Sequence, residues 1–331
     1  MIITKTPYRI SFFGGGSDYP EWYQNNGGVV LSTTINKYIY ISCRFLPNYF
    51  KHNYRIVWSK IENVKKINEI DHNAVRGILN YLKIKQGLEI HYDGDLPARS
   101  GMGSSSCFVV GLLKALYKIK NINISKSELS KKSIYIEQKI LKEVVGSQDQ
   151  VATSYGGFNK IIFNKNKSII VKKIAKANKL NQLNRNLILI FTGIQRTAHE
   201  IAHGYVKKLN KDKKNNINRL LEHVKIAENI LNSGDIDDFG RLLNEAWFEK
   251  KELSNQITNK KIDELYNRAI NCGALGGKLL GAGGGGFLLL YMKDKAKNKF
   301  FKNTKNILNV PFSFTSEGSQ IIFNDLESKA K

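Results

Sequence analysis

Cysteine is scarce and unpaired in this sequence. The 331 residues contain three cysteines, Cys43, Cys107 and Cys272, which lie far apart along the chain. They show none of the short paired spacings that hold a metal ion. Isolated thiols of this kind are typical of buried cysteines in a reducing compartment, so we expect a cytoplasmic protein.

Long apolar runs are also missing. No stretch approaches the ~20 apolar residues that a membrane-spanning helix needs. Near the N-terminus, Lys5, Pro7 and Arg9 interrupt any apolar run, which does not fit a signal peptide. We therefore expect no membrane partner, and we find no internal repeat.

Acidic residues are few relative to basic ones. The sequence has 28 Asp and Glu against 52 Lys and Arg, a formal net charge of +24. Such an excess favours nucleic acid or another polyanion. The lysines are nevertheless scattered among Asn and Ile residues, and the one dense basic segment, residues 207–214, is typical of a solvated loop. Since no aromatic–basic motif accompanies the charge, we expect an anionic small substrate and no nucleic-acid partner.

The length favours two domains with a cleft between them. A single hydrophobic core rarely grows beyond roughly 250 to 300 residues, and 42% of this chain is hydrophobic. Residues 187–191 have the pattern of a buried strand that opens a second α/β unit. We therefore expect one domain at residues 1–180 and another at residues 181–331.

Strand and helix patterns occur in both halves. Residues 125–145 are expected to form a helix that begins with a capping box between Ser125 and Glu128. Further helices are expected at 105–117, 198–209, 217–231, 239–253 and 261–271, and strands at 29–43 (one strand or a hairpin), 88–92, 187–191, 287–291 and around Phe312 and Ile321.

The most informative segment is the glycine–serine loop at residues 97–106. It follows a strand and precedes an apolar helix, a context that a flexible linker would not have. Its glycines let the backbone turn N–H groups toward an anion, and the helix N-terminus favours negative charge. A serine hydroxyl there can also reach a phosphate-bound magnesium ion. We expect a phosphate cradle made of Arg99, Ser100, Gly101, Met102, Gly103, Ser104, Ser105 and Ser106.

A second glycine cluster, residues 273–286, matches two familiar motifs only by letters. Residues 281–286 read G-x-G-x-x-G but lead into a strand, whereas a dinucleotide-binding turn leads into a helix. Lys278 is followed by Leu279, where a P-loop needs Ser or Thr for magnesium. The cluster therefore predicts a closely packed loop that supports or closes over bound phosphates, with Gly283 and Gly284 near the substrate.

Two carboxylates attract attention in the first half. Glu137 falls within an apolar stripe that includes Ile134 and Leu141, where a carboxylate is costly unless a cation or donors meet it. An edge position open to water is the alternative interpretation. Asp149 follows in the polar segment 146–150, where an Asp is usually structural in a turn, and it becomes a candidate base only because phosphate loops exist elsewhere.

These segments, in this order, resemble the GHMP family of small-molecule kinases. Residues 97–106 resemble the family's P-x-x-x-G-L-G-S-S motif, with Met102 in place of the commoner Leu, while the cluster ending at Gly286 resembles its third motif and residues 7–19 resemble its first. The resemblance implies an α+β fold. It has an N-terminal domain with a left-handed βαβ crossover, a C-terminal ferredoxin-like domain, and ATP in the cleft between them.

The resemblance also implies roles for single residues. Ser105 and Glu137 match the family's Mg²⁺ ligands, Asp149 matches its catalytic base, and Arg9 matches the cation that keeps this base ionised. ATP and Mg²⁺ are therefore the expected cofactors. Positioning and electrostatics do most of the work in a loose phosphoryl-transfer transition state. Whether Asp149 removes the proton fully or only orients the hydroxyl stays open.

Within the family, the first two motifs and residues 192–196 resemble the branch that contains heptose 7-phosphate kinases and fucokinases. Galactokinases have Glu-His at the positions of Gly15 and Gly16, so galactose is disfavoured. The resemblance implies phosphorylation of the anomeric hydroxyl of D-glycero-D-manno-heptose 7-phosphate, on the route to nucleotide-activated heptose. Another anomeric sugar kinase and a catalytically silent sugar sensor are the alternatives.

The expected substrate contacts come from separate parts of the chain. A carboxylate such as Asp18 suits recognition of sugar hydroxyls, and a substrate phosphate needs cations, for which Arg99, Arg196 and Lys278 are candidates. Trp58 either lines the adenine pocket or packs in a core. The sequence leaves a monomer and a homodimer open. The full set of expected substrate-binding residues is Gly15, Gly16, Ser17, Asp18, Arg196, Lys278, Gly283 and Gly284.

Overall fold

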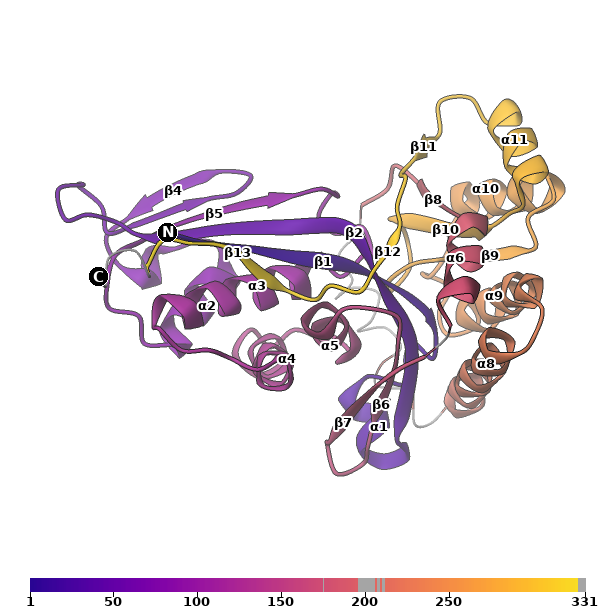
Figure 1. Cartoon of the computed structure of the whole chain (residues 1–331), viewed down its shortest axis with the longest axis horizontal. Helices are drawn as coiled ribbons and strands as arrows, with labels where there is room; N and C mark the ends of the chain where they lie inside the picture. The colour runs from indigo at the N-terminus through magenta and orange to yellow at the C-terminus, as the bar shows by residue number, and fades with distance from the viewer. Residues whose placement is uncertain (175, 196–205, 207–208, 210–211, 327–331) are drawn as a thin grey trace.

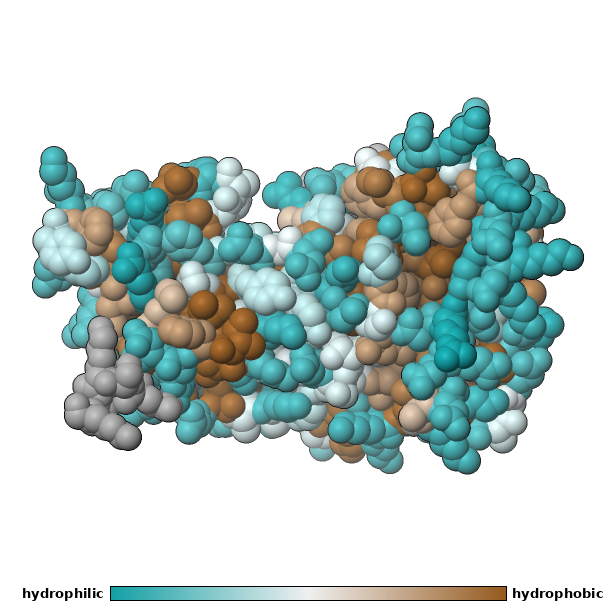
Figure 2. Space-filling model, turned by 45° about the horizontal axis from the view of Figure 1, so that its top comes forward, coloured by the Kyte–Doolittle hydropathy of each residue, from teal (hydrophilic) through white to brown (hydrophobic). Residues whose placement is uncertain are grey.

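Two β-sheets, each covered by helices, make up the fold (Figure 1). The computed structural model describes residues 1–174, 176–195, 206, 209 and 212–326. The larger sheet has nine strands and the smaller has four. Figure 2 shows the outline of the molecule indented between the two lobes, on a face that is largely hydrophilic.

The larger sheet is built on two long antiparallel strands, β1 (Ile2–Phe13) and β2 (Gly28–Phe45). Residues 29–43 therefore lie in one strand and do not form a hairpin. The main path of the sheet runs β13-β1-β2-β5-β3-β4, with β6 also on β2 and β7 on β6. The other strands are β3 (Tyr54–Val57), β4 (Ile61–Val64), β5 (Leu88–Gly94), β6 (Asn159–Phe163), β7 (Ile169–Lys173) and β13 (Gln320–Asn324).

Helices α2 (Asn73–Tyr81), α3 (Ser104–Ile119), α4 (Lys126–Tyr135) and α5 (Gln148–Tyr155) lie along one face of this sheet (Figure 1). Helix α3 carries apolar residues on nearly all of its sides, and most of it is buried. It packs against β1 and β2. The short helix α1 (Pro20–Asn26) and the 3₁₀ turn η1 (Ile67–Glu69) complete the connections.

The helix predicted at residues 125–145 is shorter than expected. Its capping box is confirmed, since the Glu128 N–H donates to Ser125 Oγ at 3.2 Å. However, α4 ends at Tyr135 and passes into a single π-helical turn, η2 (Ile136–Ile140). Single π-helical turns are frequent at functional sites, and Glu137 lies in this one.

The smaller sheet runs β11 (Leu308–Asn309), β8 (Leu187–Phe191), β10 (Phe287–Tyr291), β9 (Gly276–Leu279), with every pair antiparallel. In chain order this is fourth, first, third, second, which is the arrangement of a β-α-β-β-α-β ferredoxin-like domain. The predicted ferredoxin-like domain is thereby confirmed.

Among the described residues, five helices accompany the smaller sheet. They are α6 (Ala177–Asn186), α8 (Lys214–Asn232), α9 (Ile236–Lys251), α10 (Lys260–Asn271) and α11 (Asp294–Asn303). Most of the helix predicted at 198–209 lies outside the described residues. Among the helices described, none is both long enough and apolar enough to cross a bilayer.

The C-terminal tail returns to the larger sheet. Strand β12 (Phe314–Thr315) pairs with β2, and β13 pairs with β1. The predicted domain boundary at residue 180 would assign this tail to the second domain. Its strand pairings, however, join it to the sheet of the first domain. Between these strands the tail crosses the end of α5, where the backbone of Glu317 lies against Gly156.

We predict that the contact at Gly156 holds the tail in place. A Cβ there would lie 2.0 Å from the Glu317 carbonyl carbon. Gly156→Ala should therefore lower the free energy of unfolding by about 1–3 kcal/mol more than Gly27→Ala. Gly27 is a matched control because its φ and ψ, 77° and 161°, are close to the 71° and 159° of Gly156, yet its nearest neighbour is 3.7 Å away. If chemical denaturation showed the same loss of unfolding free energy for both variants, the contact at Gly156 would not hold the tail.

Candidate active site

The loop between β5 and α3 has the backbone features of a phosphate cradle. Arg99, Gly101 and Gly103 have φ values of 58°, 80° and 79°. Gly103 directly precedes α3, whose first N–H groups have no partner within the helix. The dipole of this 16-residue helix adds a partial positive charge at the same end.

The side chains of this loop divide into two groups. Ser100 and Met102 are buried, and Ser100 Oγ donates to the Pro97 carbonyl at 2.6 Å, so these residues shape the loop. Arg99 and Ser105 are exposed and are available to a ligand. Ser104 Oγ accepts a 3.3 Å hydrogen bond from the Arg99 N–H.

The glycine cluster of the smaller sheet packs directly on this loop. A Cβ on Gly101 would lie 2.5 Å from the Leu280 carbonyl oxygen, and one on Gly286 would lie 2.1 Å from the Ser100 carbonyl oxygen. The Phe287 N–H also donates to the Ser100 carbonyl at 3.2 Å. Backbone meets backbone here, so glycine is required and the second loop supports the first.

Gly283 and Gly284 contact their own domain. A Cβ on Gly283 would lie 2.7 Å from Ile257 Cα, and the Gly284 N–H donates to the Ile257 carbonyl at 2.8 Å. These contacts fix the outer part of the glycine cluster. That Gly283 and Gly284 lie near the substrate stays a prediction.

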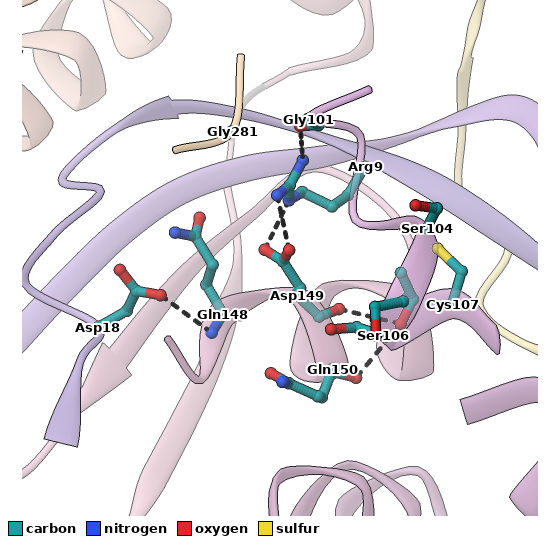
Figure 3. A network of polar contacts seen from close by, with 12 residues as sticks. Arg9, Asp18, Gly101, Ser104, Ser106, Cys107, Gln148, Asp149, Gln150 and Gly281 are labelled. Atoms are coloured by element: carbon teal, nitrogen blue, oxygen red, sulfur yellow. Dashed lines mark hydrogen bonds and ion pairs between the residues drawn. The ribbon is translucent and has the colours of Figure 1, made fainter. Parts of the chain in front are cut away.

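Arg9 and Asp149 form a bidentate ion pair beside the phosphate loop (Figure 3). Arg9 Nε and Nη2 each donate to one Asp149 oxygen at 2.6 Å, and Nη1 donates to the Gly101 carbonyl at 2.7 Å. Burial lowers the pKa of Arg9, but the Asp149 charge and hydrogen bonds outweigh burial and raise it above its usual value. The sequence placed Asp149 in a polar segment typical of a turn, whereas in the structure it lies in the first turn of helix α5.

Asp18 lies beside the start of α5. Its carboxylate accepts hydrogen bonds from the N–H groups of Gly16, at 3.0 Å, and Gln148, at 3.3 Å (Figure 3). Burial and the charge of Asp149 raise the pKa of Asp18 to about 6, although these hydrogen bonds oppose the rise. Because Asp18 binds the residue before Asp149 and is affected by the Asp149 charge, the predicted sugar-binding residues 15–18 lie next to the ion pair. Gly16 and Ser17 are buried and Gly15 is half-buried.

Glu137 is completely buried and contacts the first turn of α3. Ser105 Oγ donates to Oε1 at 3.0 Å, Ser106 Oγ donates to Oε2 at 2.8 Å, and Gln150 Nε2 donates to Oε2 as well. Burial raises the pKa of Glu137 to about 8, against the effect of these donors. The edge position open to water is therefore wrong.

These residues fit a magnesium ion. Mg²⁺ is commonly held by one or two carboxylates together with substrate phosphates, and not by a cage of protein ligands. Within the described ranges no group of three or more His, Cys, Asp and Glu side chains could hold a metal ion. The adjacent oxygens of Ser105 and Glu137 suit a metal whose other ligands come from ATP, and a buried carboxylate with a raised pKa would be stabilised by that charge.

Trp58 belongs to a small aromatic cluster that reaches α3. Its Nε1 donates to Glu62 at 2.7 Å, and its ring contacts His72 with centroids 4.9 Å apart. His72 stacks on Phe108, one turn into α3, at 4.7 Å. Because Trp58 is only partly buried, both a packing role and an adenine contact fit the structure.

Two lysines of the smaller domain reach the same region. Lys278 Nζ donates to the Phe12 carbonyl of β1 at 2.6 Å, while Lys250 Nζ donates to the carbonyls of Leu279 and Gly281 at 2.9 and 2.6 Å. The sequence offers no signal for Lys250, which is one of two adjacent lysines at the end of an amphipathic helix, and none for Gln150. Arg196 lies outside the described residues.

Comparisons with known proteins agree with this geometry. The model of the GHMP kinases N terminal domain matches residues 69–157, and that of the GHMP kinases C terminal domain matches residues 226–304. Together they cover just over half of the chain. The first match contains Ser105, Glu137 and Asp149, and the second contains Lys250 and Lys278.

Three relatives match most of the chain. The D-glycero-alpha-D-manno-heptose 7-phosphate kinase of Campylobacter jejuni is 29% identical, covering 96% of this chain and 97% of its own. The bifunctional fucokinase/GDP-fucose pyrophosphorylase of Arabidopsis thaliana is 28% identical, covering 89% of this chain and 30% of its own. A crystal structure titled as a D-glycero-D-manno-heptose 1-phosphate kinase from Bacteriodes thetaiotaomicron is 25% identical, with a TM-score of 0.79 and coverage of 98% and 99%. With both family models matched and the two glycine-rich loops in contact, the chain belongs to the GHMP family of ATP-dependent kinases.

Proposed function

We propose that the protein transfers the γ-phosphoryl group of ATP to the anomeric hydroxyl of D-glycero-D-manno-heptose 7-phosphate, giving the 1,7-bisphosphate. The observation that carries the proposal is the bidentate Arg9–Asp149 pair bound to Gly101 of the phosphate loop. It holds a carboxylate next to the position expected for the transferred phosphoryl group. The product would feed nucleotide-activated heptose for a surface polysaccharide.

Asp149 acts on the acceptor hydroxyl in this proposal. The hydroxyl oxygen bonds to the γ-phosphorus, the bond from that phosphorus to the β–γ bridging oxygen breaks, and the hydroxyl proton passes to an Asp149 oxygen as ADP leaves. Arg9 binds both carboxylate oxygens of Asp149, so the carboxylate is pre-oriented. The N–H groups at the start of α3 bind the phosphates.

Ser105 and Glu137 would hold Mg²⁺ against those phosphates. When bound, the ion neutralises charge on the phosphate oxygens. Ser106 and Gln150 orient Glu137 through their own hydrogen bonds. The Ser105 and Glu137 oxygens are already 3.0 Å apart in the hydrogen-bonded pair, so little rearrangement separates this state from one that shares an ion.

The choice of acceptor is supported by the names of the relatives and by the predicted sugar-binding residues 15–18. Two of the three relatives are described as heptose phosphate kinases. Asp18 and the glycines beside it lie next to Asp149, where a sugar would present its anomeric hydroxyl. All three cysteines are free and buried, which supports a reducing cytoplasmic setting.

The reaction can be tested by ADP release with ATP and Mg²⁺ against heptose 7-phosphate, free heptose, fucose, galactose and mevalonate. Phosphorus NMR identifies the phosphorylated position. We expect a new anomeric phosphate with heptose 7-phosphate. Turnover only with fucose would replace the acceptor and keep the kinase, and no turnover with any acceptor would favour a sugar sensor.

Asp149→Asn should remove turnover and leave nucleotide binding intact. The variant keeps the size of the side chain but loses the proton acceptor, so we expect kcat to fall about 10²- to 10⁴-fold. The Kd of a non-hydrolysable ATP analogue, measured by calorimetry, should stay nearly unchanged. An equal loss of nucleotide affinity would show that Asp149 holds the nucleotide and not the acceptor.

Glu137→Gln should raise the Mg²⁺ concentration needed for half-maximal activity by at least about tenfold, because a neutral amide is a weaker magnesium ligand than a carboxylate. Activity measured across a magnesium titration at fixed ATP tests this. Glu143→Gln is the matched control, since it removes a neighbouring negative charge and leaves the Ser105–Glu137 pair in place. Identical titrations for both variants would return Glu137 to a structural role.

A further inference from the structure

Lys250 and Lys278 form a pair of cations for which the described residues offer no acidic partner. Lys278 is 6% exposed and Lys250 is half-buried. Each ammonium group has three donors, but one carbonyl accepts from Lys278 and two accept from Lys250. Donors of both lysines therefore remain available in the described part of the chain.

The two lysines also lie close to a third cation. The charge of Arg9 acts on both of them, and that of Lys278 acts on Lys250. Burial and these neighbours lower the pKa of Lys278 to about 7 and the pKa of Lys250 well below its usual value. Asp149 is already paired with Arg9, so its negative charge does not compensate for the lysines. A bound anion would.

The location of the lysines favours the acceptor side of the site. Lys278 contacts Phe12, and the predicted sugar-binding residues 15–18 begin three residues later. The nucleotide phosphates have their own donors in the phosphate loop and at the N-terminus of α3. Lys278 places a further donor near the predicted sugar residues, and Lys250, whose charge interacts with that of Lys278, adds a second, so the pair is suited to a phosphate that the acceptor brings with it.

We propose that Lys250 and Lys278 together bind the phosphate group already carried by the acceptor and so select a phosphorylated sugar. The proposal rests on the proposed function, and it adds Lys250, from α9, as a specificity-determining residue. A phosphate dianion would supply the acceptors that both ammonium groups lack. Because the lysines come from different elements, α9 and β9, their spacing is fixed by the fold of the second domain.

The test compares phosphorylated and free acceptors in Lys250→Met and Lys278→Met. Methionine keeps an unbranched apolar stem and removes the charge. We expect the KM for heptose 7-phosphate to rise about 10- to 100-fold, the range for loss of a charged hydrogen bond. The KM of free heptose, or its inhibition constant if it is not turned over, should stay nearly unchanged, as should the Kd of an ATP analogue. Lys260→Met, at an exposed position of α10, is the matched control.

Each other outcome overturns the assignment. An equal rise in KM for phosphorylated and free heptose would show that the lysines do not recognise the acceptor's phosphate and act in the reaction itself. A change confined to the Kd of the ATP analogue would assign the lysines to the nucleotide phosphates. Unchanged constants would leave them no role in binding. If the wild-type protein does not use heptose 7-phosphate, the Kd of inorganic phosphate, measured by calorimetry, still tests whether the two lysines bind a phosphate group. Binding that is lost in both variants and kept in Lys260→Met supports the pair, and binding that survives in them refutes it.

Discussion

The arrangement of the site depends on the guanidinium group of Arg9. One edge of this group binds both oxygens of Asp149, and the remaining nitrogen binds the Gly101 carbonyl. Since a guanidinium is planar and its donors have fixed directions, these bonds fix β1, α5 and the phosphate loop relative to one another. Arg9 is buried and Asp149 is partly exposed, so removing Asp149 would leave a buried guanidinium without its carboxylate partner; the pair therefore holds the three elements together as one unit.

Glycine extends this unit to the second domain. The phosphate loop meets the glycine cluster through main-chain atoms at Gly101 and Leu280, and at Ser100 and Gly286. Main-chain surfaces have no rotamers, so donors presented by such loops need little reorganisation when charge develops on a phosphate. Lys278 adds a side-chain bond from the second domain to Phe12 of the first. The two domains thus contribute to the site as surfaces already in contact.

The sequence was sufficient for those parts of the site that depend on local chemistry. The loop at residues 97–106 and its following helix carry their own signals in glycine spacing, serine content and apolar pattern. The position of Asp149 was not predictable in this way. The helix that carries it starts at Gln148, whose N–H binds Asp18, a residue 130 positions earlier. Lys250 was likewise hidden, because its carbonyl partners lie about 30 positions further along the chain.

The positive charge of the protein acts in two ways, over long distances through the net charge and at short range through Lys250 and Lys278. A net charge of +24 acts over long distances, is screened by salt and attracts every anion, ATP and sugar phosphates alike. It cannot by itself separate a phosphorylated acceptor from any other anion. Lys250 and Lys278 differ because they lie beside Arg9, where partial burial weakens screening and like charges repel. A bound anion would relieve that repulsion, so under the proposed function the selectivity for a phosphorylated acceptor comes from these short-range cations and not from the net charge.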